Sequence, residues 1–181
     1  MSVTTTNLIQ GPAIIYAAPF GSTEPATIST LPATPFADLG GTMDGLELEV
    51  ADSYNNLTVD QLVMSPGTTR SERKVTLKTN LAEATLKNLA LAISNSDPVT
   101  NVLSLDDGLD NGGFTPKYLA IIMDGIAPGG FRRRVKIRKA LNTDKAASAY
   151  KKDEQTVIPV AFEAFYVSSA IRAVTWEDAT A

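Results

Sequence analysis

The chain has 181 residues and a formal net charge of −4, and it contains neither cysteine nor histidine. This length favours one domain, and a domain of this size buries enough surface to fold without disulfides. The missing cysteine excludes disulfides, thiolate metal sites and cysteine nucleophiles, and the missing histidine removes the commonest general base and metal ligand. We therefore expect a protein that is not an enzyme and that holds no metal or cofactor.

The first third of the chain predicts an arm, a strand, a loop and a hairpin. Residues 1–10 are a polar, threonine-rich leader and indicate a flexible N-terminal arm, followed by a single domain over 11–181. The apolar run 12–21 predicts a strand, and the proline-rich stretch 21–37 predicts a loop. Residues 39–63 alternate apolar and polar side chains, which favours a hairpin that turns at Asn55–Asn56.

That hairpin would carry an acidic face. With a turn at Asn55–Asn56, Val59 and Val63 join the face of Leu48 and Val50. The opposite face then presents three acids, which are Glu47, Glu49 and Asp60. This group could perform acid–base chemistry or bind Ca²⁺, but it lies in no dense oxygen-rich loop, so an exposed acidic surface is the simpler interpretation.

The middle of the chain predicts one helix. Residues 64–73 resemble a polar loop, and 74–79 alternate as a strand does. Asn80 and Glu83 have the spacing of a capping box, and apolar residues recur at helical spacing up to Ser94. A helix of about 13 residues is expected there, and it must pack on a sheet because it cannot form a core alone.

The remaining segments predict further strands. The apolar stretch 117–125 and the stretch 131–141 flank Pro128-Gly129-Gly130, so they should pair antiparallel. Residues 156–169 predict a long strand, at an edge or bulge because of Pro159, and 171–176 a short one. The expected fold is mainly β, a sandwich or barrel of six to eight antiparallel strands with one flanking α-helix.

Charge is distributed very unevenly along the chain. Residues 1–69 contain seven acids and no base, whereas 117–152 contain ten bases and two acids. Within the later segment, four bases alternate along one strand face and form a basic stripe, which comprises Arg132, Arg134, Lys136 and Arg138. Three interpretations remain open, namely phosphate binding, a solvated strand face, or contact with the acidic part of another copy.

The remaining motifs give only weak indications of a binding site or an enzymatic activity. The stretch 104–113, with Asp106, Asp107, Asp110 and Asn111, approaches a Ca²⁺ loop but lacks the terminal glutamate of an EF-hand. The glycine-containing segments match neither a phosphate-binding loop nor a dinucleotide fingerprint, and no nucleophile elbow occurs. The apolar runs are far shorter than the ~20 residues that cross a bilayer, and the start lacks a signal-peptide pattern, so a product of the cytoplasm is expected.

The order of four segments resembles the major tail (tail tube) proteins of long-tailed, siphovirus-type bacteriophages. These segments are FADLGGTMDGLELEVADSYNNLTVDQ, SERKVTLKT, NLAEATLKNLALAI and VIPVAFEAFYVS, and together they cover roughly residues 36–168. The resemblance implies a virion protein that forms hexameric rings, and the rings stack into the tube that conducts DNA into the host. It also implies contacts with the tape-measure protein, the tail terminator and the distal tail proteins. No contact with a membrane is expected.

The resemblance assigns expected places to the charged groups. Glu47, Glu49 and Asp60 are expected to face the lumen, where acids would repel passing double-stranded DNA. The basic stripe is expected between subunits, opposite acids of residues 1–69. The leader and the loops 22–36, 64–72 and 142–155 are candidates for bridging neighbours. The alternatives are a tail terminator or head–tail connector and, less well supported, a nucleic-acid-binding β domain.

Overall fold

The computed structural model describes residues 3–106, 115–150 and 152–179. Within these ranges the fold is mainly β, with eight antiparallel strands in one sheet and a single α-helix, as the sequence predicts. In chain order the strands are β1 Ile14–Pro19, β2 Ala37–Asp38, β3 Thr42–Leu57, β4 Gly67–Leu81, β5 Leu119–Ile126, β6 Arg132–Asn142, β7 Ile158–Ala164 and β8 Val174–Asp178. The helix α1 covers Leu86–Ala92, and the short 3₁₀ turns η1 and η3 cover Thr5–Asn7 and Pro128–Gly130.

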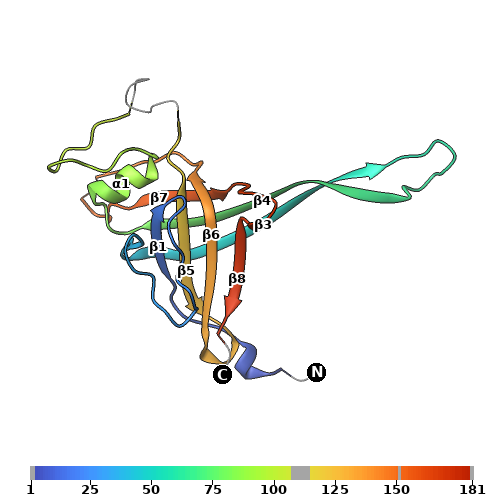
Figure 1. Cartoon of the computed structure of the whole chain (residues 1–181), viewed down its shortest axis with the longest axis horizontal. Coiled ribbons are helices and arrows are strands. Elements are labelled where there is room, and N and C mark those ends of the chain that lie inside the picture. Colours follow the sequence, from blue (N-terminus) through green and yellow to red (C-terminus); the bar gives the residue numbers. More distant parts are fainter. Residues whose placement is uncertain (1–2, 107–114, 151, 180–181) are drawn as a thin grey trace.

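The sheet has the order β2-β1-β5-β6-β7-β4-β3, and β8 pairs with β6. Strand β6 therefore forks the sheet, because its first half pairs with β8 and its last residues, 140–142, pair with β7. Figure 1 shows the consequence: β1, β5, β6 and β8 run down the body, while β7, β4 and β3 run across it. The single sheet thus forms two crossing halves.

The main core lies where the two halves of the sheet face each other. Alternate residues of β7 and β4 point inward and are fully buried, as the period-2 pattern predicts. They meet inward residues of β1, β5 and β6 in one cluster that includes Ile15, Leu77, Ile121, Ile137 and Phe162. Leu89 and Leu91 of α1 pack against this cluster, so the helix flanks the sandwich as expected.

A second, smaller core lies on the other face of β1 and β5. Ala18, Ala120 and Ile122 are buried there by Phe36, which comes from the proline-rich segment 20–36. This segment turns back over its own subunit and ends in β2, which pairs with β1. The segment predicted as a loop is therefore also a cover for one sheet face.

The helix is shorter than predicted. It begins at Leu86, and the cap is Thr85, whose hydroxyl accepts a hydrogen bond from the backbone N–H of Asn88 at 3.1 Å. Asn80 instead lies within strand β4, and the Glu83 carboxylate accepts a hydrogen bond from the backbone N–H of Gly41 at 3.1 Å. The capping-box pattern was misleading because strand pairing with β3 and β7 extends through Leu81.

The predicted hairpin turn at Asn55–Asn56 is wrong. Strand β3 continues through both residues to Leu57 and pairs with β4, so Asn55 lies opposite Thr69. The turn is the segment 58–66, and most of the predicted loop 64–73 belongs to β4. The antiparallel pair β5–β6 and the final strand β8 are confirmed. The strand expected over 156–169 is shorter, Ile158–Ala164, and it lies between β6 and β4 and not at an edge. Pro159 is tolerated there because it pairs with β4 alone, since β6 pairs with β7 only from Phe162 onward.

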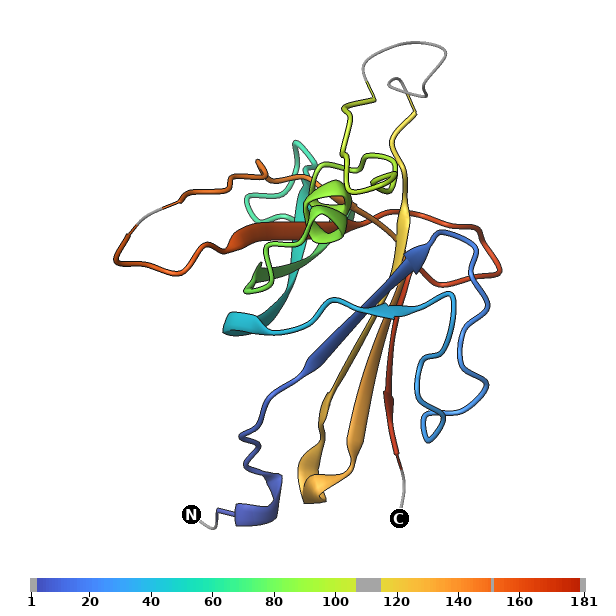
Figure 2. The ribbon, with the colours of Figure 1, turned by 90° about the vertical axis from the view of Figure 1, so that its left-hand side faces the viewer.

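Several connections project from the body. Residues 143–150 leave the end of β6 on one side, and residues 165–173 extend on the other side (Figure 2). Residues 3–10 are exposed and contain the 3₁₀ turn η1 near the β5–β6 connection. None of the helices in the part of the chain that the structure describes is long and apolar enough to cross a membrane.

Candidate functional site

The basic stripe lies on one face of β6, and it is covered. Arg134 has no exposed surface, Lys136 is 7% exposed, and Arg132 and Arg138 are half-buried. The cover is the segment 20–36, whose backbone carbonyl oxygens accept hydrogen bonds from two of the arginines. Arg134 donates to Thr27 at 3.1 Å and Arg132 donates to Ile28 at 3.1 Å.

The centre of the stripe is a buried ion pair. Nε and Nη2 of Arg134 donate to the two carboxylate oxygens of Asp124 on β5, at 2.6 and 2.7 Å. The side chain of Asp124 is 7% exposed, and the two residues are direct cross-strand neighbours. The hydrogen bonds from Arg134 to Asp124 raise the pKa of the guanidinium, so this base remains charged and fixed inside the subunit.

Two other bases of the stripe, Lys136 and Arg138, also pair with acids within the chain. Lys136 donates to Glu177 of β8 at 2.8 Å, and Glu24 lies 3.7 Å from its ammonium group. Arg138 forms a charged pair with the same Glu24 and donates to the backbone oxygen of Arg172 at 2.6 Å. Glu24 belongs to the acidic first third, so part of the charge complementarity inferred from the sequence operates inside one subunit.

This burial limits what the stripe can bind. A phosphate backbone needs accessible cations, and the two central bases are shielded by strands and by the segment 20–36. Three acids, Glu24, Asp124 and Glu177, already form ion pairs with bases of the stripe. The stripe therefore attaches the segment 20–36 to β6 within one subunit. A contact of Arg132 or Arg138 with another copy remains a prediction.

The three predicted lumen acids do not share a face. Glu47 and Glu49 point outward from β3, opposite Lys78 and Thr76 of β4, whereas Asp60 lies in the turn far from them. Lys78 donates to Glu49 at 2.5 Å, and this hydrogen bond lowers the pKa of the Glu49 carboxyl. The predicted grouping is wrong for Asp60 because the turn lies after Leu57 and not at Asn55–Asn56.

The face that carries Glu47 and Glu49 is mixed in charge. The same side of β3, β4 and β7 holds Lys74 and Lys78, and Lys74 pairs with Glu163 of β7 at 2.8 Å. Among these residues three acids face two bases. The face is therefore polar and weakly acidic. The described residues contain no cluster of three or more side chains that could hold a metal ion.

The oxygen-rich stretch 104–113 is described only as far as Asp106. That carboxylate pairs with Lys117 at 2.8 Å and accepts a bond from the backbone N–H of Ser96 at 2.8 Å. Both contacts lower the pKa of Asp106, with the Lys117 bond the larger cause. Asp107, Asp110 and Asn111 lie outside the described residues.

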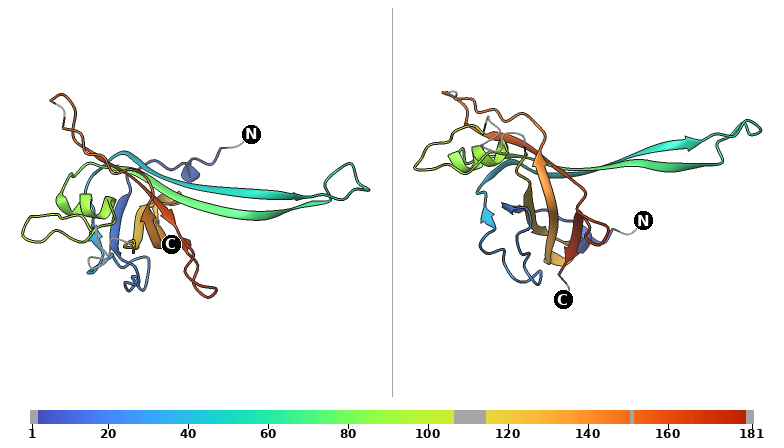
Figure 3. Two further views of the ribbon diagram at one scale, coloured as in Figure 1. Left: turned by 90° about the horizontal axis from the view of Figure 1, so that it is seen from above. Right: turned by 45° about the horizontal axis from the view of Figure 1, so that its top comes forward.

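The most prominent feature is that the hairpin expected within residues 39–63 is longer than predicted and projects from the body (Figure 3). Strand β7 pairs with β4 only from Thr76 onward, so residues 51–73 form a two-stranded ribbon, which we call the arm. Both views of Figure 3 show the arm leaving the body as a long, narrow extension. Asp52 fastens it by a bidentate hydrogen bond from Arg73 at 2.6 and 2.7 Å.

The end of the arm is apolar and exposed. Five residues at the turn, which we call the apolar tip, are 43% to 106% exposed, and they are Leu57, Val59, Leu62, Val63 and Met64. Soluble monomers rarely present such a group together. These apolar residues are visible in the sequence, but the pattern places only Val59 and Val63 on the inner face of a hairpin and Met64 in a polar loop.

Comparison with known proteins adds no assignment. No protein-family model matches the chain, and no curated protein matches it significantly. The function must therefore be argued from the arm, the covered stripe and the order of the elements.

Proposed function

We propose that this protein is a structural subunit that assembles with copies of itself, in the manner of the tail tube proteins that its sequence resembles. One observation carries the proposal: the arm projects from the body and ends in exposed apolar side chains. Such a surface is unfavourable in water and becomes favourable when a partner covers it.

The construction of the arm supports the same proposal. An isolated two-stranded ribbon is marginally stable in water, and no strand among the described residues pairs with this one outside the Thr76–Leu81 stretch of β4. It is held by its own ladder and by the ion pairs of Asp52 with Arg70 and Arg73, which contribute little because water screens them. A partner that binds the arm would complete its stabilisation, so the arm suits an assembled state.

In such an assembly the subunits would form hexameric rings, and the rings would stack into a tube in the virion tail. We assign the polar face with Glu47 and Glu49 to the lumen, since a weakly acidic wall would not retain a passing DNA molecule. The tape-measure protein would occupy the lumen before DNA does. The tail terminator and the distal tail proteins would contact the two ends of the tube.

Electron microscopy of the purified protein over a range of concentrations tests the proposal. Long tubes of uniform bore support it, and single rings would favour the tail terminator. A matched control replaces residues 54–71 by Asn-Gly, which closes the hairpin after the Ser53–Glu72 pair. This variant should keep the far-UV circular dichroism of the body and remain monomeric. An intact chain that stays monomeric at high concentration would contradict the proposal.

A further inference from the structure

The apolar tip requires a complementary surface, and the body offers an apolar groove at its far end. The groove has a volume of about 310 Å³, within the range of roughly 300–1,000 Å³ that is typical of binding pockets. It lies between α1, the end of β1 and the segment before β2. Its apolar lining comprises Ala18, Pro19, Pro35, Ala37, Leu91 and Leu119.

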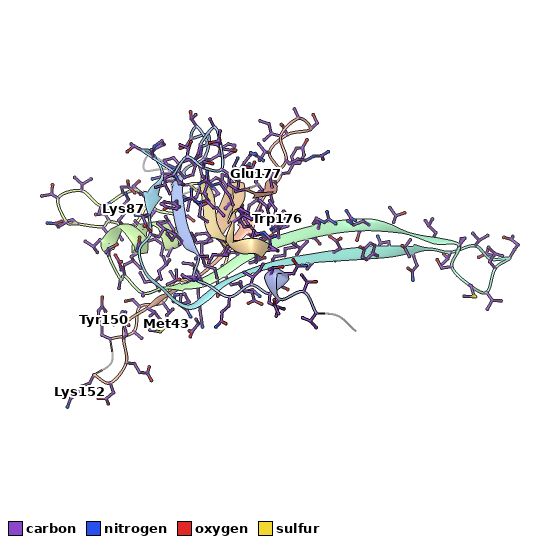
Figure 4. The ribbon with its side chains drawn as sticks, turned by 90° about the horizontal axis from the view of Figure 1, so that it is seen from below. Met43, Lys87, Tyr150, Lys152, Trp176 and Glu177 are labelled. Atoms are coloured by element: carbon purple, nitrogen blue, oxygen red, sulfur yellow. The ribbon has the colours of Figure 1, made fainter. Side chains whose placement is uncertain are left out.

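The arm of one subunit cannot reach the groove of the same subunit. The arm leaves one end of the body, and α1 lies at the opposite end (Figure 1). Figure 4 places Lys87, which stands on the rim of the groove, on the side of the body away from the arm. A contact between tip and groove must therefore join two copies, and each copy would give its arm to one neighbour and its groove to another.

The contact offers one pair of opposite charges, and the groove lining also contains the exposed acid Asp97. Asp60 is exposed within the turn at the end of the arm, and Lys87 is exposed on the rim of the groove. Neither side chain forms an ion pair within residues 3–106, 115–150 and 152–179. Lys117, also on the rim, is already paired with Asp106. Docking of the tip could bring Asp60 to Lys87 while the aliphatic side chains enter the groove.

A second hollow suits the tip less well. It lies between residues 20–24 and 167–175, and its floor includes Arg138, which is already paired with Glu24. The Oγ1 atom of Thr175 is buried there without a hydrogen-bond partner, so aliphatic side chains would leave that hydroxyl unsatisfied. The groove beside α1 is more enclosed and carries no such group among the described residues.

On the basis of the self-assembly proposed above, we propose that the apolar tip of one copy binds the groove beside α1 of the next copy. The contact is head-to-tail, because the two surfaces are different parts of the same chain. Repetition of such a contact closes into a ring or continues as a filament, depending on the rotation between neighbours. The groove is thus a receptor for a second copy of this chain.

Cross-linking tests the contact directly, since the chain has no native cysteine. One variant combines Val63→Cys in the tip with Asp97→Cys at the groove. The matched control combines Val63→Cys with Ser169→Cys, an exposed position beside the second hollow. Under conditions in which the intact protein oligomerises, a short bifunctional maleimide should give the first variant a ladder of covalent dimers, trimers and larger species. The control should stay largely monomeric on a denaturing gel.

The outcomes separate the two proposals. Oligomers without a ladder, or a ladder only in the control, would overturn the groove assignment and leave self-assembly standing. No oligomer of the intact protein at any concentration would overturn both. As a second measurement, Val63→Asp with Met64→Asp should raise the critical concentration for assembly by about 100-fold or more, because two apolar side chains that the proposed contact buries are replaced by carboxylates. Both side chains are exposed in the single subunit, so its fold should not change.

Discussion

Removing the charge of Asp124 tests whether the basic stripe fastens the subunit internally. In Asp124→Asn the Arg134 guanidinium stays buried and charged, but its bidentate partner becomes a neutral amide. Asp178→Asn is the matched control, because Arg133 also donates to both oxygens of Asp178, at 2.7 Å each. The two pairs share geometry and strand, and they differ in burial, since Arg134 is 0% exposed and Arg133 35%.

The expected magnitudes differ several-fold. Breaking a buried pair from one side costs about 3–5 kcal/mol of the free energy of unfolding, because an uncompensated charge remains inside. Breaking an exposed pair costs about 0–1 kcal/mol. The bond from Arg134 to the Thr27 carbonyl persists in the variant, so we expect about 3 kcal/mol for Asp124→Asn.

Urea unfolding followed by circular dichroism measures both costs. With a slope of about 1–3 kcal/mol/M, the Asp124→Asn midpoint should fall by at least about 1 M, and the Asp178→Asn midpoint by less than half of that. The measurements are best made with Val63→Asp and Met64→Asp present in every protein, so that association does not add to stability. Equal midpoints for the two variants would refute the internal role of the stripe.

A double substitution refines the result. Asp124→Leu with Arg134→Met removes both charges and leaves apolar side chains of similar length. Such replacements of buried pairs are often neutral in stability. The double variant should therefore be more stable than Asp124→Asn, and a larger loss would show that the hydrogen bond to the segment 20–36 matters more than the charges.

Three further changes have defined outcomes. Phe162→Ala should lower the free energy of unfolding by about 3–5 kcal/mol, because this side chain is 0% exposed in the main core; a loss below about 1 kcal/mol in urea unfolding would contradict that packing. The hydrogen bond from Arg73 lowers the pKa of Asp52 from 3.8 to about 2, so the pair supports the arm above about pH 4 and is lost as the pH falls through 2. Arg73→Gln should move the NMR titration midpoint of Asp52 back toward 3.8, and an unchanged midpoint would exclude this pairing. Gly40→Ala should lower stability by about 1–2 kcal/mol in thermal unfolding, since Gly40 has a φ of +83°; an unchanged melting temperature would show that the turn relaxes.

The sequence predicts the strands that border the core and fails where burial is absent. Ile158, Val160 and Phe162 alternate and are buried, so the period-2 pattern was reliable for β7. In the arm both faces are exposed, so apolar and polar residues need not alternate there as they do in a half-buried strand. The pair Asn55–Asn56 therefore resembles a turn in the sequence although it lies within a strand. Strand β3 continues there because β4 supplies a hydrogen-bonded partner, which is information held elsewhere in the chain.

The charged residues show the same limit. The alternation along β6 correctly places Arg134 and Lys136 on one face, but it cannot say what covers that face. The cover comes from residues more than 100 positions earlier, through Glu24, Thr27 and Ile28. Long-range contacts of this kind have no local pattern, so the sequence does not predict the burial of Arg134 and Lys136.

The fork at β6 determines how the subunit would respond to force. A pull on the arm passes through β4 into β7. Among the described residues, β7 joins the rest of the sheet through the short ladder at residues 140–142 of β6 and one flanking backbone hydrogen bond at each end, from Phe165 to Lys139 and from Thr143 to Ala161. Away from this junction, the two halves of the sheet are held together by the packed side chains of the main core. A stretched subunit should therefore yield first at this narrow seam, where few hydrogen bonds share the load, while each half keeps its own ladders intact.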